Sequence, residues 1–294
     1  GETLLSTGIG LVATMFAMGS LAHPAPRRYT DHGPLGKEKK MKGSMDINCD
    51  MGESFGNWNM GDDTGMMPRI TTANVACGFH ASDPLTMLET VKLAKAHNVE
   101  VGSHPGLPDL LGFGRRAMNI TPEDAHAYVV YQTGALQAAL KVHNMRLHHI
   151  KPHGAFYSLL RTEESLAEAV ADAIAELSDT PMLYWPAPTD AAMPTAAKRK
   201  GIRVVGEIYP DLIYAPDGSL ILQRAKHATD TEFAAAQVKR FVETNKVEAN
   251  DGSLIELDAE SICIHGDGPN ATEVGDAVNK MLKDIGCSVT SVLA

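Results

Sequence analysis

The feature that most constrains this chain is a regular alternation of short apolar segments with amphipathic helical segments after Met45. Such an alternation predicts a parallel sheet with right-handed helical crossovers, either open and doubly wound or closed into a barrel. A barrel needs roughly 250 residues, and the chain has 294. Seven segments have the length and composition of buried strands: Met45–Cys49, Thr71–Cys77, Val99–Ser103, His148–Lys151, Met182–Trp185, Ile202–Glu207 and Ser261–Ile264.

Several helices between these strands have readable ends. Asp83 before Pro84 and Thr121 before Pro122 each predict an N-cap followed by proline at the first helical position. On the first of these helices one face is predicted to carry Leu85, Leu88, Val91 and Ala94. Three further helices are predicted over Glu163–Leu177, Thr189–Lys200 and Asn270–Ile285, the last two ending at Gly201 and Gly286.

Polar residues at the strand ends distinguish the two architectures. An open sheet gathers its ligand-binding groups at one switch point, whereas a barrel brings all of its strand ends to one mouth. The spread over six strands therefore favours a distorted (β/α)7-type, TIM-like barrel. The residues concerned are Asn48, Asp50, Glu53, Asn74, His80, His104, Lys151, His153, Glu207, His265 and Asp267.

The segment Tyr209–Arg224 interrupts this alternation. Pro216-Asp217-Gly218 is a turn signal between two β-prone runs, which predicts a β-hairpin inserted after strand six. It would lie on the mouth side of the barrel, where it could form a wall or lid.

Residues 1–44 are predicted to be a flexible leader outside the fold, followed by one domain over residues 45–294. An uncharged run from Leu4 to Ala22 barely reaches membrane-spanning length and contains several Gly, Ser and Thr residues. The residues after it are rich in Pro, Gly and Lys, as in a solvated linker. A membrane or organelle address is the alternative interpretation of this leader.

Charge and cysteine content narrow the class of partner. Lys plus Arg number 26 and Asp plus Glu number 36, a net charge of −10, which argues against nucleic acid or an anionic membrane as the main partner. The four cysteines include no CxxC pair, so we expect reduced thiols in a cytoplasmic protein.

Four histidines are the main chemical signal, because each follows a different strand: His80, His104, His153 and His265. Imidazoles at a shared mouth could transfer protons, stabilise an oxyanion or bind zinc or manganese. An internal polar layer that satisfies its own hydrogen bonds is the structural alternative. No HExxH motif is present, so the spacing does not identify a metal. Lys151 could be a cationic clamp, a base with a depressed pKa, or the ion-pair partner of Asp50.

Two glycine-rich segments suggest anion binding. Arg115 and Arg116 follow Gly112-Phe113-Gly114 and could hold a carboxylate or phosphate. Solvation at the surface is the alternative for at least one of them. The segment from His265 to Asn270 leads into a predicted helix N-terminus, which favours anions. Neither GxxxxGK[ST] nor GxGxxG occurs, so a nucleotide would have to bind by other means.

Five segments carry a resemblance to a known family: Asp46–Gly56, Ile70–Pro84, Val101–Arg116, His148–Tyr157 and Cys263–Ala271. In this order they resemble the LamB/YcsF family, known as the A subunit of ATP-hydrolysing 5-oxoprolinase and, in fungi, as lactam utilization protein. The resemblance implies a β/α barrel of the glycoside hydrolase/deacetylase type. It also implies ATP-driven opening of 5-oxo-L-proline to L-glutamate together with partner subunits, one of which could be the chain that binds ATP.

One departure from the bacterial pattern follows strand six. Bacterial members tend to carry an acidic–basic ADR element there, whereas this chain has Tyr209-Pro210-Asp211-Leu212, as in the fungal branch. The substrate could therefore be another small lactam, such as 2-pyrrolidinone.

The resemblance and the chemistry of amide opening lead to a hypothesis about roles. Asp50 with His80 or His104 would transfer protons. Lys151 and His153 would stabilise charge on the amide oxygen, and Arg115 would hold the substrate carboxylate. We expect the other polar residues to bind substrate or phosphate: Asn48, Glu53, Asn74, Glu207, His265 and Asp267. The alternatives are a metal-dependent deacetylase or carbohydrate-active barrel, and a non-catalytic substrate-binding subunit.

Overall fold

The computed structural model describes residues 41–180, 182–221 and 227–293. Apart from its last four residues, the predicted leader therefore lies outside the described residues. Among the helices that are described, none is both long and apolar enough to cross a membrane.

Seven parallel strands form a closed barrel, which confirms the predicted fold class. In sequence order they pair with one another from β1 to β11, and β11 pairs with β1 to close the ring, with Asn48 opposite Cys263. All seven coincide with predicted strands to within two residues: β1 (Ser44–Met51), β2 (Thr72–Ala76), β3 (Glu100–His104), β4 (Leu147–Ile150), β5 (Met182–Pro186), β6 (Arg203–Ile208) and β11 (Ser261–Ile264).

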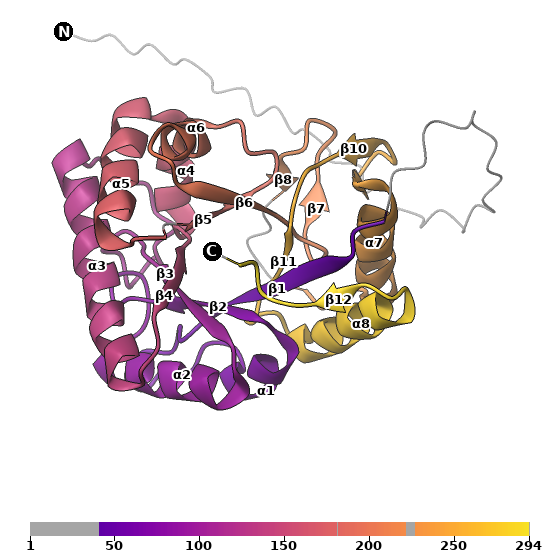
Figure 1. The fold of residues 1–294 in the computed structure, drawn as a ribbon, viewed down its shortest axis with the longest axis horizontal. Helices are drawn as coiled ribbons and strands as arrows, with labels where there is room; N and C mark the ends of the chain where they lie inside the picture. The colour runs from indigo at the N-terminus through magenta and orange to yellow at the C-terminus, as the bar shows by residue number, and fades with distance from the viewer. Residues whose placement is uncertain (1–40, 181, 222–226, 294) are drawn as a thin grey trace, which may run out of the picture. The chain divides into compact units, whose positions relative to one another are not determined.

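Helices surround the strands, as Figure 1 shows. The predicted caps form: the Asp83 carboxylate accepts from the backbone N–H groups of Leu85 and Thr86, and Thr121 makes a capping box with Asp124. The bounds are α1 (Asp63–Met66), a 3-10 turn η1 (Met67–Arg69), α2 (Pro84–His97), α3 (Pro122–Val142), α4 (Gly154–Thr162), α5 (Glu164–Leu177), α6 (Ala192–Arg199), α7 (Thr231–Thr244) and α8 (Ala271–Asp284).

The predicted buried face of α2 was partly wrong. Leu85 and Leu88 are 69% and 37% exposed. The buried stripe instead consists of Met87, Thr90, Val91 and Ala94. These four positions follow the i, i+3, i+4, i+7 spacing of one helix face, so the hydroxyl-bearing Thr90 takes a core position that hydrophobicity alone assigns to leucine.

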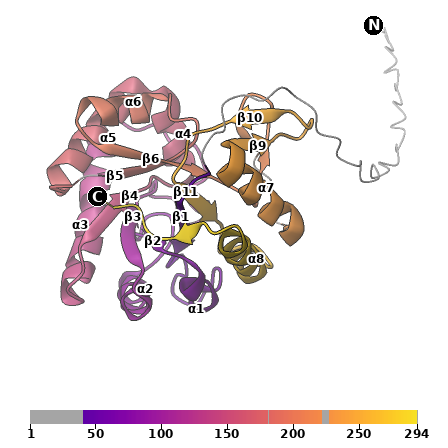
Figure 2. The same ribbon diagram turned by 45° about the vertical axis from the view of Figure 1, so that its right-hand side comes forward.

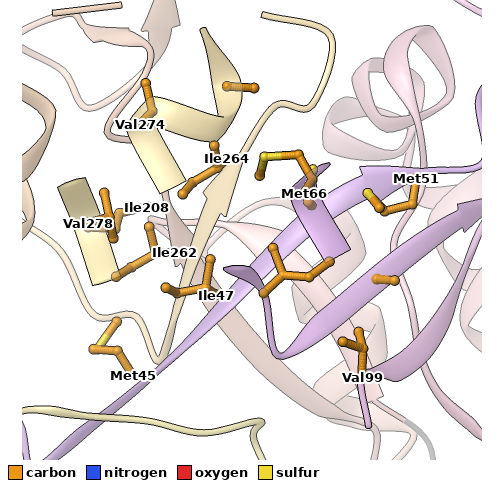
Figure 3. Packing of buried hydrophobic residues seen from close by; sticks show 14 of the residues in the cluster. Met45, Ile47, Met51, Met66, Val99, Ile208, Ile262, Ile264, Val274 and Val278 are labelled. Carbon is orange, nitrogen blue, oxygen red and sulfur yellow. The ribbon is translucent and has the colours of Figure 1, made fainter. Parts of the chain in front are cut away.

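Side chains of β1 alternate between two environments, because successive residues of a strand point to opposite faces of a sheet. Ile47 and Met51 belong to the apolar layer between strands and helices, whereas Asp46, Asn48 and Asp50 make hydrogen bonds inside the barrel. Figure 3 shows this apolar layer, where Ile262 and Ile264 of β11 lie beside Val274 and Val278 of α8. The barrel interior is therefore polar.

The predicted hairpin is present after strand six, formed by β7 (Ile213–Tyr214) and β8 (Leu220–Ile221). Part of its segment, 222–226, lies outside the described residues. A second hairpin, β9 (Lys246–Glu248) and β10 (Leu254–Glu256), was not predicted. It lies beside α7 (Figure 2) and is joined to the first hairpin by a bridge between Tyr214 and Ala249. A short strand, β12 (Ser288–Val289), pairs with the start of β1.

Candidate active site

A cavity of about 830 Å³ opens at the carboxyl ends of the barrel strands. Its wall includes the first hairpin and the N-terminal turns of α4 and α8. Six of the predicted site residues line it: Asp50, His104, Arg115, Lys151, His153 and His265. The geometry that the sequence predicted, with several strand ends sharing one mouth, is therefore present for these six.

Lys151 lies at the centre of a buried polar network. Its ammonium nitrogen is 3.4 Å from Asp50 Oδ1 and 3.2 Å from Glu207 Oε2. It also donates hydrogen bonds to Asn48 Oδ1 (3.1 Å) and Cys263 Sγ (3.1 Å). One cation thus compensates two carboxylates, one from β1 and one from β6.

The charges around Lys151 and Asp50 shift the pKa values of both groups. Burial alone would lower the pKa of Lys151, but the charges of Asp50, Cys263 and Glu207 outweigh it and raise that pKa well above its ordinary value. Burial likewise opposes ionisation of Asp50, yet His104 and Lys151 hold the pKa of Asp50 well below its usual range. Of the three predicted alternatives, these shifts favour an ion-paired cation over a neutral base.

Three residues expected to bind substrate lie in the layer beneath the cavity instead. Asn48, Asn74 and Glu207 are fully buried. Asn74 Nδ2 donates to Asp50 Oδ1 (2.8 Å), and Asn48 Nδ2 donates to Glu207 Oε2 (2.9 Å). They orient Asp50 and Lys151, because each amide has its hydrogen-bonding groups committed to the network.

Three of the predicted histidines converge with Glu53. The rings of His80 and His153 are stacked in parallel at 3.7 Å, and His104 stands edge-on to both. His104 Nε2 is 3.0 Å from His153 Nδ1. Glu53 Oε1 lies 3.5 Å from His80 Nε2 and 4.0 Å from His153 Nδ1. We call these four residues the His–Glu cluster.

Backbone carbonyls fix two of the imidazoles. His104 Nδ1 is 2.6 Å from the carbonyl oxygen of Lys151, and His153 Nε2 is 2.8 Å from that of Phe113. A carbonyl only accepts, so each of these nitrogens carries a proton. Burial, reinforced by His104, lowers the pKa of His153 to about 3. Burial, with the neighbouring imidazoles, holds the pKa of His80 well below its ordinary value.

Two glycines allow the chain to approach these rings. A Cβ on Gly106 would lie 2.5 Å from His80 Nδ1, and one on Gly114 would lie 2.6 Å from His80 Cβ. Gly114 also has a positive φ of 64°, which L-residues rarely adopt. The glycines in the His104–Arg116 loop are therefore needed to close the wall around His80.

His265 does not join the other three histidines. Its Nδ1 and its backbone N–H both lie 2.9 Å from Asp211 Oδ2, and its ring stacks on Tyr209. Tyr209 in turn donates a hydrogen bond to Glu207. Of the four histidines expected at one rim, His80, His104 and His153 therefore lie together, and His265 lies apart from them.

The two adjacent arginines have different partners. Arg116 pairs with Asp109 in its own loop. Arg115 lines the cavity, its side chain 49% exposed and its Nη2 3.9 Å from Asp267 Oδ2. Arg115 is therefore the one of the two that is available to a ligand.

Several residues of the site were missed by sequence reasoning. Cys263, His149 and Tyr209 contact Lys151, Asn74 and Glu207 from within the barrel or at its rim. The alternation of inward positions contained a signal for two of them: Cys263 lies two residues before His265, and His149 lies two before Lys151. Asp211 was noted as a departure from a family pattern but not as the partner of His265.

Known proteins resemble the chain along its described barrel. Residues 45–294 match the LamB/YcsF family. The chain is 42% identical to the 5-oxoprolinase A subunit of Shouchella clausii over 84% of this chain and 97% of that protein. It is 45% identical to the 5-oxoprolinase A subunit of Thermococcus onnurineus over 83% and 96% of the two chains. The lactam utilization protein of Thermus thermophilus superposes with a TM-score of 0.79 at 42% identity, covering 85% of this chain and 100% of that one. The chain belongs to the LamB/YcsF family.

Proposed function

We propose that this chain is the lactam-binding, catalytic subunit of an ATP-dependent hydrolase that opens 5-oxo-L-proline to L-glutamate. The observation that carries the proposal is the buried Asp50–Lys151–Glu207 network beside His104, at the floor of a single cavity. The family role supports the reaction class, because two relatives at 42% and 45% identity are named as A subunits of 5-oxoprolinase.

The chemistry requires an external drive. A five-membered lactam is a resonance-stabilised amide with little ring strain, so unassisted attack of water on its carbonyl carbon is slow. Transfer of a phosphoryl group from ATP to the amide oxygen, with release of ADP, activates that carbon. Water then adds to the carbon, the C–N bond breaks as the ring nitrogen takes up a proton, and a second water hydrolyses the resulting acyl phosphate to the carboxylate and inorganic phosphate. Pockets for drug-sized ligands span roughly 300–1,000 Å³. The cavity of about 830 Å³ lies within this range and is large enough for a phosphorylated lactam.

The charged groups of the cavity suit these steps. Asp50 is held as a carboxylate and lines the cavity, 3.5 Å from His104 Nε2, so Asp50 serves as the base for the attacking water. Lys151 lines the same cavity, and its ammonium group would stabilise the negative charge that develops on the amide oxygen. His153 also lines the cavity, but its Nε2–H is already committed to the carbonyl oxygen of Phe113. Arg115 at the rim holds the substrate carboxylate. Arg161 and the N-terminus of α8 also line the cavity and favour phosphate oxygens.

Partner chains belong to this proposal. The relatives are named as one subunit of 5-oxoprolinase, and we propose that companion subunits supply the ATP site. The four cysteines are buried free thiols, which suits a reaction in the reducing cytoplasm.

The test is lactam-dependent ATP hydrolysis by the full chain reconstituted with its candidate partner subunits, with 5-oxoproline and 2-pyrrolidinone as alternative substrates. Asp50→Asn keeps the shape of the side chain and removes its charge, so turnover should fall by roughly 100-fold or more. Asp284→Asn, an exposed change on α8, is the matched control and should retain activity. Full activity of a folded Asp50→Asn protein would remove this chain from the chemistry and leave it with a binding role only.

A further inference from the structure

The His–Glu cluster (Glu53, His80, His104 and His153) is an unusual set of donors to bury together. One ligand atom from each lies within 4.8 Å of the others, and all four residues are buried. Both ring nitrogens of His80 have no hydrogen-bond partner among the described residues, although the side chain is almost completely buried. Buried polar groups normally have partners, so the cluster is incomplete as a hydrogen-bonded layer.

The hydrogen bonds of His104 and His153 show which of their ring nitrogens carry a proton. Because His104 Nδ1 and His153 Nε2 both donate to backbone carbonyls, His104 Nε2 and His153 Nδ1 are the ring nitrogens that can offer a lone pair. These two nitrogens face each other at 3.0 Å. A cation between them or beside them would be bound by both.

A carbonyl-anchored imidazole is also the arrangement that orients metal ligands. Histidines that bind a metal through one nitrogen commonly donate the other N–H to a carbonyl or carboxylate, which fixes the tautomer and the ring orientation. His104 and His153 both have this arrangement, and a carboxylate oxygen of Glu53 lies 4.0 Å from the second ring nitrogen of His153. Two imidazoles and one glutamate are a donor set that zinc enzymes use with a fourth position open.

The distances fit one small cation. Zinc lies about 2.0–2.1 Å from its nitrogen ligands, so neighbouring ligand atoms of a tetrahedral site are about 3.3 Å apart. The cluster has separations of 3.0 Å between the two imidazoles and 4.0 Å from Glu53 to His153. His80 is stacked in parallel on His153, so a cation in the plane of one ring is outside the plane of the other. We therefore assign His80 to the wall of the site, beside Glu53, and not to the ligand set.

We propose that Glu53, His104 and His153 bind one divalent transition-metal ion, of which zinc is the best match. Imidazole nitrogens favour zinc over magnesium, whose preferred ligands are oxygen atoms. The open position would face Asp50, whose Oδ2 is 3.5 Å from His104 Nε2. A bound ion there would polarise an amide oxygen or a water molecule. Metal binding is measured without substrate, so the outcome of this test does not depend on the lactam reaction.

The experiment is calorimetric titration of the chelator-treated full-length chain with Zn²⁺, Mn²⁺ and Mg²⁺ as separate probes. We expect one Zn²⁺ per chain, bound at least about tenfold more tightly than Mg²⁺. His153→Gln and Glu53→Gln should each weaken Zn²⁺ binding by at least roughly tenfold. The matched control His97→Gln removes an exposed histidine at the end of α2 and should leave the titration unchanged.

Two measurements keep the result unambiguous. Circular dichroism establishes that each variant is folded before it is titrated. Anomalous diffraction at the zinc edge should place the ion within about 2.0–2.2 Å of the three proposed ligand atoms. Absence of stoichiometric Zn²⁺ binding, unchanged affinity in folded His153→Gln, or an ion located on surface histidines would each overturn the assignment. In that case a proton shared between His104 Nε2 and His153 Nδ1 would account for their separation of 3.0 Å.

Discussion

Replacing Lys151 with methionine removes one buried cation and leaves two carboxylates facing each other. The ammonium nitrogen is 3.4 Å from Asp50 and 3.2 Å from Glu207. With an effective dielectric constant of 20, Coulomb's law gives about 5 kcal/mol for each of these pairs. Methionine has similar length and apolar packing, so the substitution changes the charge with little change in volume.

The expected cost is smaller than the Coulomb sum of the two pairs. A carboxylate that loses its cation can take up a proton or recruit water, which limits the penalty. Breaking a buried ion pair from one side costs about 3–5 kcal/mol in general. We therefore expect Lys151→Met to lower the free energy of unfolding at pH 7 by about 3–5 kcal/mol, measured by urea unfolding followed by circular dichroism. Adding Glu207→Gln should restore part of this loss, because one of the two uncompensated charges is then absent.

Lys92→Met is the control. Lys92 is 65% exposed and 3.3 Å from Glu89 on α2, and such surface pairs contribute under about 1 kcal/mol. A loss of less than about 1 kcal/mol in Lys151→Met, or a further loss on adding Glu207→Gln, would refute the account of Lys151 as the counter-ion of two buried carboxylates.

Three further predictions concern the substrate, the glycine wall and the pH dependence. Arg115→Gln should raise KM for 5-oxoproline by roughly 10–100-fold and leave 2-pyrrolidinone unaffected, because 2-pyrrolidinone has no carboxylate; equal effects in steady-state assays of the two would contradict the role of Arg115. Gly114→Ala should lower the free energy of unfolding by about 2–4 kcal/mol, because the new methyl group adds a clash to a positive φ. Gly201→Ala has the same backbone conformation with open space around it and should lower the free energy of unfolding by about 1–2 kcal/mol. Thermal unfolding of the two variants tests this difference. Burial, reinforced by His148 and Lys151, holds the pKa of His149 well below 6.5 in the folded state, so its contribution to stability is present above pH 6.5 and is lost as pH falls. The stability gap between the wild-type chain and His149→Gln should therefore narrow by about 1.4 kcal/mol between pH 7.5 and 5.5; a constant gap in urea unfolding would show that His149 titrates normally.

Much of the fold could be predicted from local patterns. The seven barrel strands, the capping residues Asp83 and Thr121, and the turn at Pro216-Asp217-Gly218 all depend on a few neighbouring residues, and all are present. The helices α1, α4 and α7 and the hairpin β9–β10 were not predicted. All of these except α7 are short, so they offer few residues of periodicity to recognise. The helix α7 has 14 residues and was missed although Asp230 caps its N-terminus.

The site was only partly predictable, for a different reason. The sequence by itself determined which polar residues stand at the carboxyl ends of the strands, because strand order and the two-residue repeat are local properties. Only the closed barrel decided that Asp50 faces the cavity while Asn48, two residues earlier, lies one layer below and bonds Glu207. The closed barrel likewise decided that His265 contacts Asp211 while His104 contacts His153. Those partners come from strands far apart in the chain, and their contacts depend on the stagger of the ring, which no short stretch of sequence encodes.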